Sequence, residues 1–145
     1  MYSDPEVESF IEKSFTPARF HVKEQPDAFP RFGAEWTPTV LISSSAGKEH
    51  HRIEGFLPKD DFMGQLRLGL AHLAREGGDF ESAEKRYREM ADSAQPDLAA
   101  EALYWAGVSS YKRTGDGSVL TDTARRMRER FADSTWMKKA SVWEK

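Results

Sequence analysis

The chain of 145 residues contains no cysteine. This absence excludes disulfide bonds, thiolate metal ligands and cysteine nucleophiles within these residues. No stretch approaches the roughly 20 consecutive apolar residues that a membrane span needs, and the amino terminus lacks the basic and apolar regions of a secretion signal. We therefore expect a globular chain with no membrane partner, and a cytoplasmic location is the default expectation.

An excess of one charge is also lacking. The 21 basic and 24 acidic residues give a net charge of -3 and are spread along the chain, so no strong field would attract nucleic-acid phosphates. We expect no nucleic-acid partner. Basic runs such as "KRYRE" are interleaved with acids and are interpreted as solvated helix faces.

Four histidines are present, and two of them, His50 and His51, are adjacent in a stretch that has a strand pattern. Neighbouring side chains of a strand point to opposite faces, which makes a shared metal ion difficult. We interpret these histidines as solvated side chains and predict no metal site and no cofactor.

The N-terminal part mixes helix and strand patterns. The first fifteen residues predict a helix that Ser3 or Asp4 caps. After it, Ala18, Phe20 and Val22 alternate with polar and basic residues, a pattern that predicts a half-buried strand.

A hairpin follows this first strand. Residues 25–35 predict a short helix that Pro30 breaks and that stops near Gly33. Residues 39–42 and 50–56 predict the two strands of a β-hairpin, because turn residues lie between them.

Beyond the hairpin only helical patterns appear. A long amphipathic helix is predicted from Pro58 to the glycines at 77 and 78, and four further helices follow it. The dipeptide "GD" recurs at a spacing of 37 residues, and "LG" at Leu68 corresponds to "AG" at Ala106, 38 residues later. This recurrence resembles the tetratricopeptide repeat, whose period is about 34 residues.

The loop "WTPT", the hairpin and the following "GFLPKDDFMGQL" resemble the C-terminal part of the thioredoxin fold. This resemblance implies a cis peptide bond between Thr37 and Pro38. The expected fold class is therefore an incomplete thioredoxin-like α/β unit over residues 1–76, followed by an all-α tetratricopeptide-like helical-hairpin tail over residues 77–145.

One departure from the thioredoxin pattern bears on function. The family's first strand, helix and strand, with their CxxC pair, have no counterpart in this sequence, so the dithiol chemistry is not carried over. The expected strands at Phe20 and at Val40 are then left with unpaired edges. Two explanations stay open: the sequence is a fragment or late start of a longer product, or the sheet is completed by a partner chain.

The resemblance also implies a contact site. Trp36, Thr37 and Pro38 match the loop that offers backbone groups to an extended polypeptide in the thioredoxin family. The alternative is a loop that serves folding alone.

A second candidate site is the aromatic-rich tail. Tyr104, Trp105, Tyr111 and Trp136 are candidates for partner binding. The alternative is that these rings pack between helices, as most aromatic side chains of helical repeats do.

These observations predict a non-catalytic chain that acts through contacts with a protein or peptide and forms a homodimer or higher oligomer. No catalytic residue is assigned. The alternative is a fragment or late-start form of a thiol-disulfide oxidoreductase whose CxxC pair lies upstream of Met1.

Overall fold

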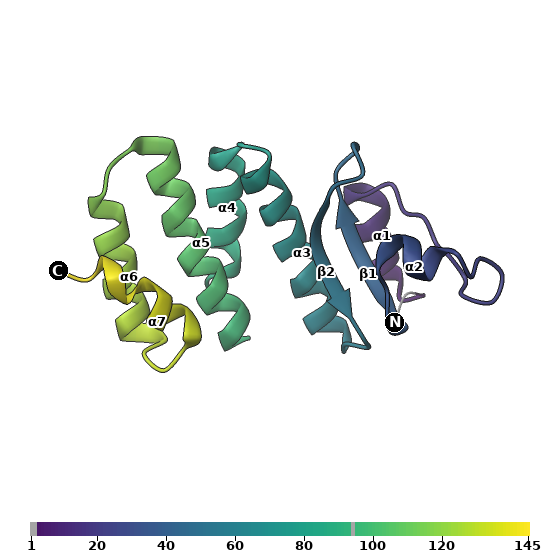
Figure 1. The fold of residues 1–145 in the computed structure, drawn as a ribbon. Coiled ribbons are helices and arrows are strands. Elements are labelled where there is room, and N and C mark those ends of the chain that lie inside the picture. The colour runs from purple at the N-terminus through teal and green to yellow at the C-terminus, as the bar shows by residue number, and fades with distance from the viewer. Residues whose placement is uncertain (1–2, 94) are drawn as a thin grey trace.

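The computed structural model describes residues 3–93 and 95–145, which form a row of elements from the N-terminal hairpin unit to the C-terminal helices (Figure 1). The described part holds seven α-helices and one two-stranded antiparallel sheet, so the α+β class is confirmed. None of its helices combines the length and apolar character that crossing a membrane requires. The elements are α1 (Pro5–Ser14), α2 (Ala28–Phe32), β1 (Thr39–Ser43), β2 (Glu49–Glu54), α3 (Lys59–Glu76), α4 (Phe80–Met90), α5 (Pro96–Thr114), α6 (Ser118–Arg130), α7 (Thr135–Ala140) and a final 3-10 helix (Ser141–Trp143).

The first helix forms where the capping residues predict it. The Asp4 carboxylate accepts hydrogen bonds from the backbone N–H groups of Glu6 and Val7, at 2.9 and 3.3 Å, and satisfies donors that the first turn leaves free. Lys59 Nζ lies 2.6 Å from Glu6 Oε2 and 3.2 Å from Asp4 Oδ1. This lysine therefore ties the start of α1 to the start of α3.

The strand predicted at Ala18, Phe20 and Val22 is wrong. The structure has no strand between α1 and α2, and Phe20 and Val22 are 43% and 39% exposed. Phe20 instead contacts Phe32 of α2, with ring centroids 5.3 Å apart. Apolar alternation makes a strand only when a neighbouring strand supplies hydrogen-bond partners, and no described strand lies there.

The short helix is confirmed, but its predicted break is wrong. α2 includes Pro30 and ends at Phe32, with Gly33 as its C-cap. Pro30 lies in the first turn, where a helix needs no donated N–H, so proline is tolerated there. Arg52 of β2 fastens α2 to the hairpin, because its guanidinium donates to the carbonyls of Phe32 and Gly33 at 2.6 and 3.2 Å.

The predicted hairpin is confirmed. Thr39 pairs with Glu54 and Ile42 pairs with His51, and the register shifts by one residue beyond Ile42, where Ser43 pairs with Glu49. The shift leaves His50 as the extra residue of a β-bulge, which re-aims its side chain.

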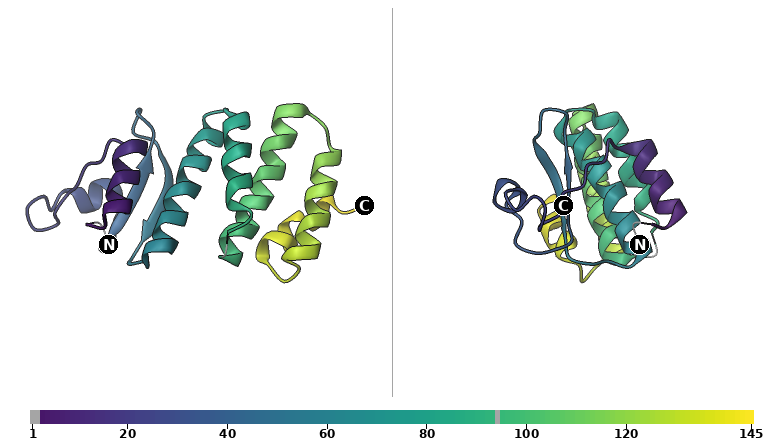
Figure 2. Two further views of the ribbon diagram at one scale, coloured as in Figure 1. Left: turned by 180° about the vertical axis from the view of Figure 1, so that it is seen from behind. Right: turned by 90° about the vertical axis from the view of Figure 1, so that its right-hand side faces the viewer.

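The long helix α3 contributes to two hydrophobic clusters. One face of α3 packs with α1 and the hairpin, which lie beside it in Figure 2, and another face packs with α4 and α5. The α3 residues of the first cluster are Phe62, Met63 and Leu66, and those of the second are Leu68 and Ala71. α3 therefore joins the hairpin unit to the helical tail.

The four helices predicted after Gly78 are present as α4 to α7. The glycines of the recurring "LG" and "AG" dipeptides make different contacts. A side chain at Gly69 would meet Ile42 of the hairpin, whereas one at Gly107 would meet Thr123 of α6. The two glycines occupy corresponding positions in the recurring dipeptides, but they pack against different kinds of element.

Candidate functional site

The loop before β1 is held closely against the end of the hairpin. The Thr37–Pro38 peptide bond is cis, as predicted. The Thr39 hydroxyl donates to the Trp36 carbonyl at 2.6 Å, and the Gly55 N–H donates to the Pro38 carbonyl at 2.7 Å. These two bonds fix the backbone of all three predicted contact residues.

Two aromatic side chains at this end of the hairpin face solvent. Trp36 is 68% exposed and Phe56 is 71% exposed. They precede β1 and follow β2, and the pairing of Thr39 with Glu54 brings the two segments together. Within the described residues, β1 has a strand neighbour on one side only. This end of the molecule therefore combines exposed apolar surface with an open strand edge.

Three of the four aromatic residues predicted in the tail lie together. Tyr104 contacts Trp105 and Trp136 with ring centroids 5.2 Å apart in both cases, and it stacks on Trp143 at 4.7 Å. The side chains in this cluster are all half-buried, namely Tyr104, Trp105, Trp136 and Trp143. Tyr111 does not join them: it lies farther along α5 and is 39% exposed.

Cations of the chain itself cover two rings of this aromatic cluster. The Arg75 guanidinium carbon lies 3.8 Å from the Trp105 ring centroid, and Lys139 Nζ lies 4.0 Å from that of Trp136. Because these ring faces are already engaged, packing between α3, α5 and α7 accounts for them.

A buried polar network lies next to Trp105. Tyr87 O–H lies 2.5 Å from His72 Nδ1 and receives the Arg75 Nε–H at 3.1 Å. On the other side of the ring, His72 Nε2 lies 3.3 Å from a Glu101 carboxylate oxygen. Both ring nitrogens of His72 therefore have a polar partner, Tyr87 on one side and Glu101 on the other. Burial raises the pKa of Tyr87 to about 12, which keeps its hydroxyl protonated.

The hairpin joins this network through His51. Its Nε2 lies 2.8 Å from Gln65 Oε1, and its ring centroid lies 5.4 Å from that of His72. Burial lowers the pKa of His51, and the positive charge that His72 can carry lowers it further, against the opposing hydrogen bond with Gln65. Burial therefore favours the neutral form of the His51 imidazole over the charged form.

The interpretation of the histidines as solvated is wrong for three of the four. His50 pairs with the Glu76 carboxylate, while His51 and His72 belong to the buried network. His50 and His51 both reach α3, although they are neighbours in β2, because His50 is the bulge residue. Only His21 is exposed.

The sequence held one signal for this network. His72 interrupts the apolar stripe of α3 next to Ala71 and Leu68, and a polar residue at such a position needs a buried partner. Its partners come from other elements, so their identity was not readable. Over residues 3–93 and 95–145, no group of three or more histidine, aspartate or glutamate side chains is placed to hold a metal ion.

In comparisons with known proteins, the chain matches no family model, no curated protein and no solved structure. The thioredoxin-like and tetratricopeptide-like assignments therefore stay predictions from the resemblance of sequence motifs.

Proposed function

We propose that this chain is a non-catalytic protein that acts through protein–protein contacts made at the end of its hairpin. The observation that carries the proposal is the exposure of Trp36 and Phe56 at one end of a hairpin in which β1 has an open edge. Large exposed apolar side chains mark interaction surfaces, and tryptophan is enriched among the residues that dominate binding energy. An open strand edge offers unpaired backbone groups to another chain.

The occupant that we propose for this edge is β1 of a second copy. A strand that pairs with its own copy across a two-fold axis perpendicular to the sheet pairs antiparallel, which is the arrangement already present between β1 and β2. The product is a four-stranded sheet. Its apolar face continues from Val40 and Ile42 of one copy to the same residues of the other, and Trp36 lies at the rim of the contact.

Light scattering behind size exclusion, run across a dilution series, tests the proposal. The chain of 16.5 kDa is expected to elute as a dimer at micromolar concentration. Replacing both Trp36 and Phe56 with serine should weaken the dimer at least about tenfold, because complete burial of an apolar side chain contributes about 1.5–3 kcal/mol and the contact covers part of both rings. The matched control is Tyr111→Ser, which removes an exposed ring from α5. A monomeric wild-type chain at about 100 μM, or a double variant as dimeric as the wild type, would contradict the proposal.

A further inference from the structure

The hairpin approaches α3 closely at Gly69. A Cβ atom added there would overlap Ile42 Cδ1 and would lie 3.3 Å from His51 Cδ2. Because glycine carries no side chain, both hairpin residues reach the backbone of α3. An imidazole that can gain a proton therefore lies inside the contact that holds the hairpin to the rest of the chain.

A second imidazole faces the first across this contact. The ring centroids of His51 and His72 lie 5.4 Å apart, and His72 is buried. His51 belongs to β2, whereas His72 belongs to the same helix as Gly69. We call the contact of Ile42 and His51 with Gly69 and His72 the histidine joint. A positive charge on both rings would repel the hairpin from α3.

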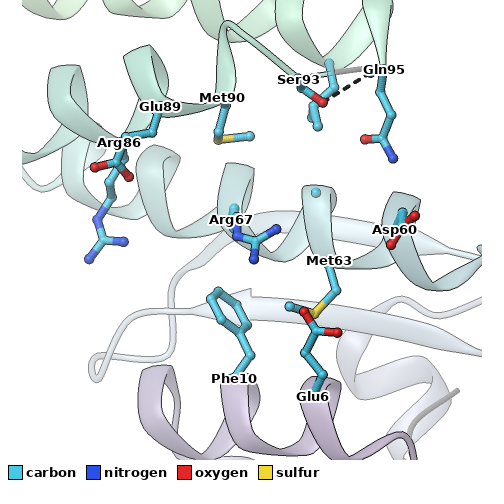
Figure 3. A pocket seen from close by; sticks show the side chains of 12 residues that line it. Glu6, Phe10, Asp60, Met63, Arg67, Arg86, Glu89, Met90, Ser93 and Gln95 are labelled. Carbon is cyan, nitrogen blue, oxygen red and sulfur yellow. Dashed lines mark hydrogen bonds between the residues drawn. The ribbon is translucent and has the colours of Figure 1, made fainter.

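The histidine joint occupies one face of α3. The α3 residues that meet the hairpin recur at helical spacing, and they are Gln65, Gly69, His72 and Glu76. Figure 3 shows another face of α3, where Met63 and Arg67 line a groove together with Phe10 of α1. That groove contains no residue of the histidine joint. The charge of the joint is therefore set on the hairpin side of α3.

The carboxylates beside the histidine joint can balance one positive charge but not two. Glu101 of α5 lies 3.3 Å from His72 Nε2, and its charge also favours the charged form of His51. Glu49 of β2 acts on His51 in the same direction, but it already pairs with Arg52 at 2.7 Å. A first proton is therefore balanced by Glu101, whereas a second proton has no unshared carboxylate among these groups.

The other titratable neighbours do not balance the second charge either. Arg75 of α3 is itself positive, and it donates to the Tyr87 hydroxyl of α4, which lies beside His72 Nδ1. Tyr87 stays neutral, because burial raises its pKa to about 12. Glu76 is engaged by His50 and lies 3.5 Å from Arg75 Nη2. The strand β1 contributes no titratable side chain.

One contact of the hairpin acts in the opposite direction. A charged His50 attracts the Glu76 carboxylate more strongly than a neutral one does, so acid strengthens this pair. However, Glu76 is partly exposed and is shared with Arg75, and partly exposed ion pairs contribute little. Two charged imidazoles held together away from water cost more, because burial and like charge both disfavour them. Acid therefore favours separation of the two rings.

We propose that the histidine joint makes the attachment of the hairpin to α3 sensitive to pH: in mildly acidic solution the hairpin separates from α3 locally, while helices α4 to α7 stay folded. Separation lets the charged His51 enter water and moves it away from His72. The two hydrophobic clusters of the helical tail contain no hairpin residue, so the tail keeps its own packing. The joint lies on the side of the hairpin toward α3 and exists within a single copy, so the proposal does not depend on the self-association proposed above.

Amide hydrogen exchange of the whole chain tests the proposal. Protection of the β2 amides is measured at about pH 7.5 and about pH 5.5, in several low concentrations of urea, and is corrected for the intrinsic dependence of exchange on pH. Urea separates the two kinds of opening, because a local opening exposes little surface and responds weakly to urea. We expect the β2 amides to exchange through such a local opening, with protection about three- to tenfold lower at the lower pH, since an exposed histidine is about nine-tenths charged there.

Two results of this measurement would overturn the proposal. The first is protection of the β2 amides that does not change with pH. The second is β2 protection that equals that of the α5 amides and responds to urea as strongly, because the hairpin would then open only when the whole chain unfolds.

Two variants with opposite expected effects assign the pH dependence to the histidine joint. His51→Gln takes up no proton, so the loss of β2 protection at low pH should disappear. Glu101→Gln removes the counter-charge and should enlarge that loss at least about twofold; because Glu101 is partly exposed, this variant tests the proposal even if His51→Gln folds poorly. The matched control is His21→Gln, which removes an exposed histidine and should keep the wild-type response. A wild-type response in His51→Gln, or a smaller loss in Glu101→Gln, would contradict the proposal.

Discussion

Replacing Gly107 with alanine is expected to destabilise the fold, although alanine favours a helix more than glycine does. A Cβ at this position of α5 would lie 2.7 Å from Thr123 Cγ2 and 2.9 Å from Thr123 Cβ, with the hydroxyl oxygen closer still. Because the Thr123 Cβ is bonded directly to the backbone, rotation of the side chain cannot relieve the overlap. α6 must move away from α5 instead.

The expected change in the free energy of unfolding is the difference between two opposing effects. Helix propensity stabilises alanine over glycine by about 0.8–1.0 kcal/mol, and overpacking a filled core typically costs about 1–3 kcal/mol. We expect the upper part of that range, since α6 must shift, and hence a net loss of about 1–2 kcal/mol in the free energy of unfolding. For a chain of this length, the melting temperature should fall by roughly 3–6 °C.

Urea unfolding and thermal unfolding, both followed by circular dichroism, measure this change. Gly117→Ala is the control, because Gly117 has a φ of -64° and no atom within 4 Å of an added Cβ; its effect should stay within about 0.5 kcal/mol. In a Thr123→Ala background the penalty of Gly107→Ala should shrink. A Gly107→Ala variant about 1 kcal/mol more stable than the wild type would show that propensity alone acts and would refute the close packing of α5 on α6.

Three further outcomes are expected. Burial lowers the pKa of His51, so the unfolded chain binds a proton at this residue more readily than the folded chain does. The free energy of unfolding should therefore fall as the pH drops below about 6.5. In urea titrations His51→Gln should reduce this dependence of the free energy of unfolding on pH, while the exposed control His21→Gln should keep it. Tyr87→Phe leaves His72 and Arg75 without their shared hydroxyl and should cost about 1–3 kcal/mol in urea unfolding, so a loss below about 0.5 kcal/mol would contradict the network. Because the chain has no thiol, it should not accelerate insulin reduction by dithiothreitol above a buffer control, and turnover that survives repurification would contradict the non-catalytic proposal.

Local signals explain which parts of the fold were predictable. Asp4 caps α1 with its own side chain, and the turn between β1 and β2 is closed by the Ser44 N–H donating to the Lys48 carbonyl at 2.9 Å. Each signal acts within a few residues of sequence, so the sequence alone predicts the element. The helices of the C-terminal tail are predictable from similar local sequence patterns.

The polar network depends instead on tertiary packing. His51, His72, Tyr87 and Glu101 come from four different elements, and only the packing of α3 against the hairpin, α4 and α5 brings them together.

The wrong strand prediction and the proposed dimer have a common physical basis. Phe20 and Val22 have the alternation of a half-buried strand but stay exposed, and the outer edge of β1 is unpaired in the described chain. In both places a backbone with strand character lacks the hydrogen-bonding neighbour that makes a strand stable. The segment around Phe20 would therefore need a neighbouring strand to become a strand itself, and the described residues supply none. A second chain that pairs with β1, as proposed above, would supply those hydrogen bonds at an edge where Val40 and Ile42 already provide an apolar face.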